Sequence, residues 1–140
     1  QGYIAAHSLE AGVPSREIRL SMTDLPLSQQ MTAYDNQFYK DPENIKNNFD
    51  LLVDNTFTTR ISGSAVFDIA MIIVGKLNSR IWHHTEPYDI APAFAFLKND
   101  GLLINLYNGN QAILTDKAII ATTDISVFGQ LKKIGCFGSY

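Results

Sequence analysis

The sequence has very little cysteine, since Cys136 is the single one among 140 residues. An intrachain disulfide is therefore impossible. Chains without disulfides are typical of reducing compartments, so we predict a cytoplasmic protein. Cys136 has no histidine or acid beside it in the sequence, which favours a half-buried thiol over a nucleophile.

A large charge of one sign and long apolar runs are also lacking. The 11 basic and 14 acidic residues give a formal net charge of −3, so no basic patch for nucleic acid and no polybasic patch for a membrane is expected. The longest apolar stretch, residues 65–74, is interrupted by Asp68 and is too short to span a bilayer. We expect neither nucleic acid nor a membrane among the partners.

The first residues contain no initiator methionine and no signal-peptide pattern. We interpret the chain as part of a longer protein, with a strand already under way near residue 3. The apolar content of 46%, with eight Phe and six Tyr, is sufficient for a hydrophobic core. No repeat or linker interrupts the sequence, so we predict one domain over residues 1–140.

Hydrophobic periodicity and turn residues predict the order of elements. Helices are expected after Asp41, from about 65 to 76, from 89 to 98, and after Asp124. From Asp41 onward helices and strands mostly alternate, which predicts an α/β fold with a layered, mostly parallel sheet and helices on both faces. The expected strands are 3–7, 17–20, 30–34, 56–61, 80–83, 102–106 and 117–122.

The first strand-to-helix junction that could carry chemistry is residues 60–65. Ligands of open α/β sheets gather where strands end and helices begin, and Gly63 permits a tight turn there. Free amides of Ser64 and Ala65 would face outward at the helix start and favour an anion such as phosphate. Simple capping of the helix by Ser64 is the alternative.

The second junction is residues 86–93. Asp89 stands where a helix N-cap is expected, and Pro92 would fall within the first helical turn. Asp89 either caps this helix or serves as a carboxylate ligand for a hard cation such as Mg²⁺, which prefers oxygen donors. One carboxylate is too few for a catalytic magnesium site, so further ligands must come from elsewhere.

The two junctions and the segment between them resemble the inositol monophosphatase family. The resemblance is good from about residue 60 to residue 101, is looser toward the C-terminus, and before residue 56 rests only on the order of elements. It implies the C-terminal half of a sugar phosphatase fold. The residues that carry it are Arg60, the Gly63-Ser64-Ala65 turn, Asp68, 75–77, 81–82, 87–91 and 98–101.

The resemblance implies a magnesium-dependent phosphatase that hydrolyses a small phosphate monoester, either inositol monophosphate or a related sugar phosphate. Asp89 would bind the catalytic Mg²⁺, and Gly63, Ser64 and Ala65 would lend backbone amides to the substrate. Trp82 stands seven positions before Asp89, where the family often has a Glu that contacts substrate hydroxyls. We therefore predict that Trp82 belongs to the substrate site and that the preferred substrate differs from inositol phosphate.

The family's Asp-Pro-Ile/Leu-Asp-Gly-Thr motif is absent, because Asp41-Pro42 is followed by Glu43-Asn44. The resemblance thus implies that the N-terminal metal-binding half is missing and that this chain has little activity alone. The missing half and a small phosphorylated substrate are the expected partners. Two alternatives stay open: a non-catalytic module that binds an anion at helix N-termini, or a remnant that covers exposed apolar surface by forming a homo-oligomer.

A zinc site at His83, His84 and Glu86 is not expected. Adjacent histidines on a strand should point to opposite faces of the sheet, and the His-Glu-x-x-His order is absent. Asp68, inside an apolar helix, should need a backbone or basic partner in the core.

Overall fold

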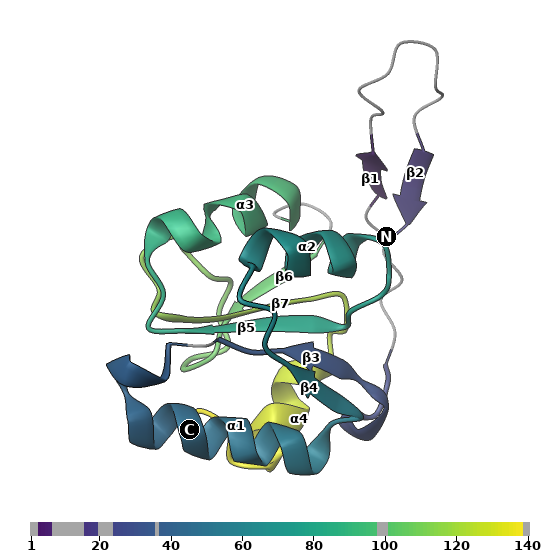
Figure 1. Ribbon diagram of the computed structural model, residues 1–140. Helices are drawn as coiled ribbons and strands as arrows, with labels where there is room; N and C mark the ends of the chain where they lie inside the picture. Colours follow the sequence, from purple (N-terminus) through teal and green to yellow (C-terminus); the bar gives the residue numbers. More distant parts are fainter. Residues whose placement is uncertain (1–2, 7–15, 20–23, 36, 98–100, 139–140) are drawn as a thin grey trace.

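The fold is built around a five-stranded sheet, which the computed structural model places between helices on both of its faces (Figure 1). The structure describes residues 3–6, 16–19, 24–35, 37–97 and 101–138. The sheet consists of β3 (Met31–Ala33), β4 (Thr58–Arg60), β5 (Ser79–His83), β6 (Leu102–Asn105) and β7 (Ala118–Thr122).

The sheet is mixed, with the strand order β4-β3-β5-β7-β6. β3 pairs in parallel with β4 and β5, whereas β7 pairs antiparallel with β5 and β6. β4, β3, β5 and β6 therefore point in one direction and β7 in the other. The predicted fold class, a layered and mostly parallel α/β sheet with helices on both faces, is confirmed.

Helices α2 (Ala65–Ile73) and α3 (Pro87–Leu97) cover one face of the sheet (Figure 1). Side chains alternate along a strand, so β7 directs Ile119 and Ala121 toward these helices. They pack with Trp82 of β5 and with Ile69 and Ile90 of the two helices. Within the described part of the chain, no helix is long and apolar enough to cross a membrane.

Helices α1 (Pro42–Asn55) and α4 (Val127–Lys133) cover the opposite face. Ile120 of β7 packs there with Ile45 and Leu52 of α1 and with Leu131 of α4. The helix predicted after Asp41 is thus present, and Val53 of α1 is 50% exposed. The short helices η1 (Leu27–Gln29) and η2 (Phe38–Lys40) flank β3.

A separate two-stranded antiparallel sheet is formed by β1 (Tyr3–Ala6) and β2 (Arg16–Arg19). Its register runs from Tyr3 opposite Arg19 to Ala6 opposite Arg16. The two strands predicted at 3–7 and 17–20 are thus present, while His7 lies outside the described residues.

One edge of the five-stranded sheet gathers the two junctions singled out in the sequence. Because β4, β3 and β5 are parallel neighbours, their carboxyl ends lie together, at the left of the sheet in Figure 1. β4 leads through Gly63 to α2, and β5 leads to α3. β3 lies between β4 and β5, so the two strands are about 10 Å apart.

Candidate functional site

The carboxyl ends of β3 and β4 lie beside Arg80, the second residue of β5, which pairs with Ala33 and is 4% exposed. Its Nη1 donates a hydrogen bond to the Tyr34 carbonyl, and its Nε lies 3.4 Å from Oδ2 of Asp68. Burial lowers the pKa of Arg80, while the carboxylates of Asp68, Asp35 and Asp89 act in the opposite direction. The sequence pattern predicted only a strand at Arg80, although a cation directly before the apolar pair Ile81 and Trp82 could have indicated a buried charge.

Asp68 links Arg80 to the first junction. Its Oδ2 accepts a 2.9 Å hydrogen bond from the hydroxyl of Ser62, the residue that precedes Gly63. Burial raises the pKa of Asp68, and the Ser62 hydrogen bond and the charge of Arg80 oppose that shift. The predicted need of Asp68 for a partner in the core is confirmed.

The Gly63 turn has the predicted backbone, with a left-handed φ of 75° that glycine adopts without strain. Ser64 differs from the prediction. Its N–H donates to Oγ of Ser62 at 3.1 Å, and its own Oγ accepts from the N–H of Phe67 at 3.3 Å. Ser64 is therefore a helix cap whose amide already has a partner, and Ala65 follows it as the first residue of α2.

The second junction begins earlier than predicted. α3 starts at Pro87, which suits a first helical position, and the N–H of Asp89 donates to the carbonyl of Glu86 at 3.0 Å. The N-cap prediction for Asp89 is wrong, and Pro92 lies inside the helix rather than in its first turn. Asp89 is half-buried in the first turn, where the helix dipole favours a carboxylate.

Trp82 lies in the core between the sheet and helices α2 and α3, with 1% of its surface exposed. The guanidinium of Arg80 is 5.3 Å from the centre of its ring. A side chain that is covered by core residues offers no surface to a substrate. The burial argues against a direct contact between Trp82 and a substrate, and its place in the substrate site stays a prediction.

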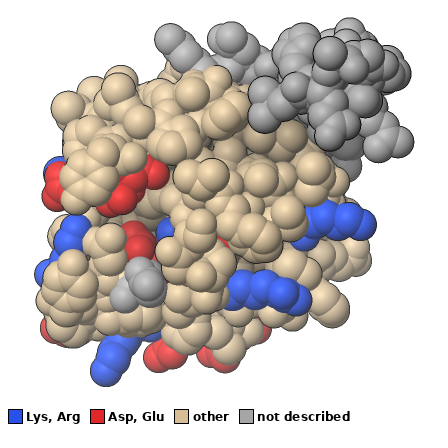
Figure 2. Space-filling view, turned by 45° about the horizontal axis from the view of Figure 1, so that its top comes forward, with Lys and Arg blue, Asp and Glu red and all other residues tan. Residues whose placement is uncertain are grey.

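Charges of both signs lie at this edge. The carboxylates of Asp35, Asp68 and Asp89 act on the guanidinium of Arg80, and Arg60, the last residue of β4, adds a second positive charge. Figure 2 shows acidic and basic side chains together beside a hollow at the left of the molecule.

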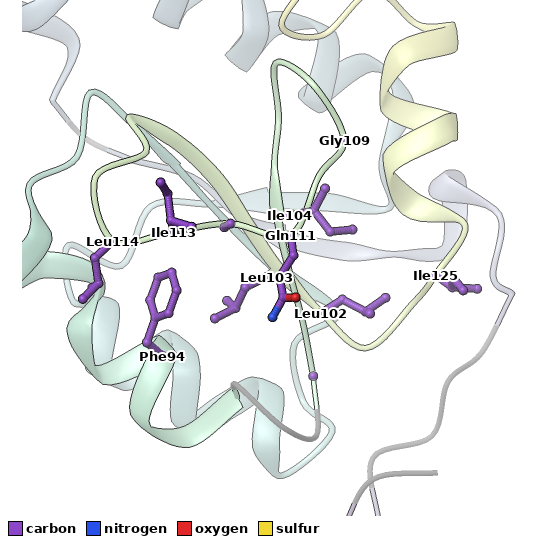
Figure 3. Close-up of a pocket in the computed structure, with 11 residues that line it drawn as sticks. Phe94, Leu102, Leu103, Ile104, Gly109, Gln111, Ile113, Leu114 and Ile125 are labelled. Atoms are coloured by element: carbon purple, nitrogen blue, oxygen red, sulfur yellow. The ribbon is translucent and has the colours of Figure 1, made fainter.

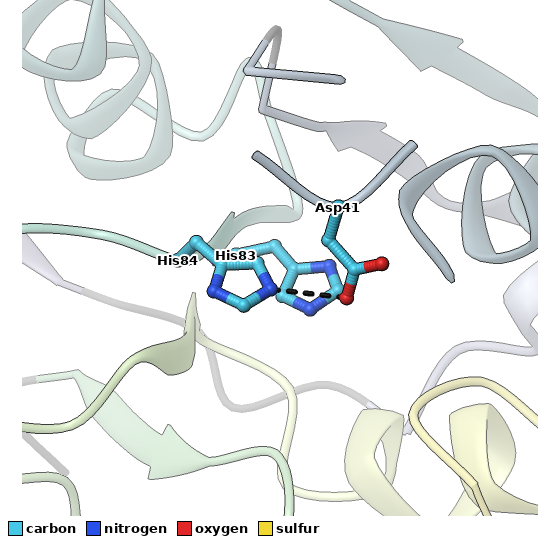
Figure 4. Close-up of side chains that lie close together, drawn as sticks. All are labelled: Asp41, His83 and His84. Carbon is cyan, nitrogen blue, oxygen red and sulfur yellow. Dashed lines mark hydrogen bonds and ion pairs between the residues drawn. The ribbon is translucent and has the colours of Figure 1, made fainter. Parts of the chain in front are cut away.

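A second cluster, which we call the His–Asp cluster, consists of Asp41, His83 and His84 (Figure 4). The two imidazole rings stack with centres 4.6 Å apart and planes 13° apart. The prediction that they point to opposite faces is wrong, because β5 ends at His83 and His84 adopts a left-handed φ of 54°. Oδ2 of Asp41 lies 3.1 Å from Nε2 of His84.

An apolar pocket of about 810 Å³ lies between α3 and β6 (Figure 3). Phe94, Leu103, Ile113 and Leu114 are among the side chains that line it, and Gln111 is the polar one. Among the lining residues that the structure describes, none is an acid, a base or a nucleophile.

No family model matches the chain. A stretch of 58 residues is 43% identical to triosephosphate isomerase of Baumannia cicadellinicola subsp. Homalodisca coagulata, over 40% of this chain and 23% of that protein. A match this short assigns no family. The mixed, open sheet also differs from the closed parallel barrel of eight strands for which that enzyme's fold is named.

Solved structures give a consistent likeness. The chain superposes on the inositol monophosphatase of Anabaena (Nostoc) with a TM-score of 0.71 and 22% identity, over 94% of this chain and 52% of that one. The superposition on the suhB protein of Bartonella henselae has a TM-score of 0.72 and 18% identity, and it covers 89% of this chain and 49% of that one. The superposition on the Thermotoga maritima IMPase has a TM-score of 0.66 and 20% identity, and it covers 89% of this chain and 49% of that one.

Identities in this range establish the fold rather than the activity. The chain spans about half the length of the solved structures that it matches. The expected resemblance is confirmed at the level of the fold: this chain has the inositol monophosphatase fold over about half the length of those proteins.

Proposed function

We propose that this chain supplies part of the active site of a magnesium-dependent phosphatase. Its substrate would be a small phosphate monoester, inositol monophosphate or a related sugar phosphate. One observation carries the proposal: the strands that lead to Gly63 and to Asp89 end at the same edge of a sheet with the inositol monophosphatase fold. In open α/β sheets, ligands bind beyond the carboxyl ends of the strands.

The two junctions follow strands β4 and β5, which flank β3. A cation on Asp89 and the Gly63 turn could contact the same phosphate group, because metal–oxygen bonds are about 2.1 Å and N–H···O contacts about 2.9 Å long. Asp89 would hold the metal, and the backbone of Gly63, Ser64 and Ala65 would face the phosphate. Because the amide of Ser64 already donates to Oγ of Ser62, the amide of Ala65 is the better donor to a phosphate.

Asp89 fits Mg²⁺ as one ligand of several. It is a half-buried carboxylate in the first turn of a helix, and carboxylate oxygen is the donor that Mg²⁺ prefers. Asp68 is committed to Arg80 and Ser62, so it is not a free second ligand. When bound, the metal would activate water and neutralise charge on the phosphoryl group, while Asp89 orients the ion.

The other ligands would come from another part of the protein. We propose an N-terminal half that carries them, and we expect residues 1–140 alone to have little activity. A homo-oligomer and a cytoplasmic location belong to the same proposal. The alternative of a metal-free anion-binding module is weakened by the capping of α2, because Ser62 and Ser64 take up amides that an anion would need.

The test is phosphatase activity of the complete gene product on inositol monophosphate, with Mg²⁺. Asp89→Asn should lower kcat by about 100-fold or more, the usual size of effect when one group that stabilises developing charge is lost. Glu86→Gln is the matched control, because Glu86 precedes the same helix but pairs with Lys117. Full activity of the Asp89 variant would remove Asp89 from the proposed site.

A further inference from the structure

We propose that the His–Asp cluster, Asp41, His83 and His84, is a binding site for a transition-metal dication of the zinc class. The cluster offers one ligand atom from each side chain, and these atoms all lie within 4.8 Å of one another. The proposal is independent of the magnesium site at Asp89, because it uses none of the same side chains.

The donor set decides the kind of metal. Two imidazole nitrogens and one carboxylate oxygen match the three protein ligands of many zinc sites, in which a fourth position stays open. Imidazole suits zinc, copper and nickel, whereas Mg²⁺ prefers oxygen donors. The cluster should therefore discriminate strongly against Mg²⁺.

The three side chains are already held in place within the cluster. Nδ2 of Asn44 donates hydrogen bonds of 3.2 and 3.0 Å to the two carboxylate oxygens of Asp41. His83 is 2% exposed, and its ring centre lies 5.0 Å from that of Phe137. His84 already directs Nε2 at the Asp41 carboxylate.

The surroundings of His83 resemble the outer shell of a metal ligand. Its Nδ1 lies 3.4 Å from the hydroxyl of Tyr34, which is fully buried, and its Nε2 lies 3.3 Å from the hydroxyl of Tyr107, which is 50% exposed. Metal-bound histidines usually have such a hydrogen-bonding partner on the second nitrogen. Because Tyr107 is the more exposed of the two, we assign Nε2 to the ion, which would displace the Tyr107 hydroxyl while Tyr34 keeps its contact with Nδ1.

His84 has a left-handed φ of 54°, and its ring stacks on that of His83. Histidine adopts this backbone conformation more often than most residues do. The stacked rings direct their lone pairs side by side, so binding requires a rotation of the exposed ring. The side chains of His84 and Asp41 are 37% and 26% exposed, which leaves room for that rotation and for entry of the ion.

A bound ion would tie the start of α1 to the end of β5, because Asp41 precedes α1 and His83 closes the strand. The test uses the whole chain and cobalt(II) as a spectroscopic substitute for zinc. We expect one equivalent of cobalt(II) to give visible absorption bands, zinc to abolish them, and a large excess of Mg²⁺ to leave them unchanged. Zinc should also raise the melting temperature.

His84→Gly is the decisive variant, since glycine accepts the left-handed backbone and removes the imidazole without disturbing the fold. It and Asp41→Asn should weaken cobalt(II) binding by at least about tenfold, because even outer-shell changes at metal sites cost about 10- to 100-fold. Glu86→Gln should bind as the wild type does. The proposal is overturned if the wild-type chain binds cobalt(II) no more tightly than His84→Gly, or if Glu86→Gln is the variant that loses binding.

Discussion

Two contacts between an acidic and a basic side chain near the same edge of the sheet differ mainly in how far the side chains are buried. Arg80 and Asp68 have side chains 5% and 4% exposed with a 3.4 Å contact, whereas His84 and Asp41 are 37% and 26% exposed with a 3.1 Å contact. Exposed pairs contribute about 0–1 kcal/mol to stability. A buried charge that loses its partner costs far more. Burial, rather than the distance between the charged atoms, therefore distinguishes the pair that stabilises the fold from the pair that is accessible to a ligand.

The largest expected effect comes from the deep pair. Arg80→Met leaves the Asp68 carboxylate in the core without its cation, and we expect a loss of about 3–5 kcal/mol in the free energy of unfolding. Urea denaturation measures it. The double variant Arg80→Met/Asp68→Leu should recover most of the loss, because no unpaired charge remains. A loss below about 1 kcal/mol in the single variant would place this pair with the exposed one.

The second effect separates the two histidines. His83 is 2% exposed and its pKa is lowered to about 4, from an ordinary value of 6.5, chiefly by burial. Between these values the unfolded chain binds more protons than the folded one, so stability is full above pH 6.5 and falls as the pH drops toward 4. The loss should reach about 3 kcal/mol at the acid end of that window.

Urea denaturation across this pH range, in the wild type and in His83→Gln, isolates the contribution of His83. The variant should lose most of the dependence on pH in the window, since glutamine does not titrate. An identical pH profile in both proteins would mean that other groups cause it.

The smallest effect concerns the exposed pair. His84→Gly removes a left-handed backbone cost of about 1–2 kcal/mol and an exposed contact with Asp41, which adds little to stability. In the absence of metal, we expect a variant about as stable as the wild type or up to about 1 kcal/mol more stable. Thermal and urea unfolding measure this, and a clear destabilisation would show that the His–Asp cluster holds the fold by itself.

Local patterns predicted the fold well. The β-branched and apolar runs predicted each strand of the sheet. The predicted start of α3 was wrong, because a helix can start at proline and Pro87 rather than Asp89 begins it. Capping residues are ambiguous in sequence, because a carboxylate in the first turn and one at the N-cap satisfy the same dipole.

The sites were harder to predict, because their contacts are far apart in the sequence. The apolar helix around Asp68 predicted a buried carboxylate that needs a partner, but no local pattern identified Arg80 as that partner. His84 and Asp41 are 43 positions apart, and the left-handed turn after β5 breaks the alternation on which the prediction rested. A histidine in that conformation leaves no mark in the sequence.

The most direct test of the proposed function is a crystal structure of the complete gene product grown with Mn²⁺, as a substitute for Mg²⁺, and inorganic phosphate. We predict a metal bound to the carboxylate of Asp89, with phosphate between it and the turn at Gly63. Phosphate held at the Gly63 turn without metal would support the anion-binding module instead. A side chain of Asp89 that contacts neither ion would contradict the account.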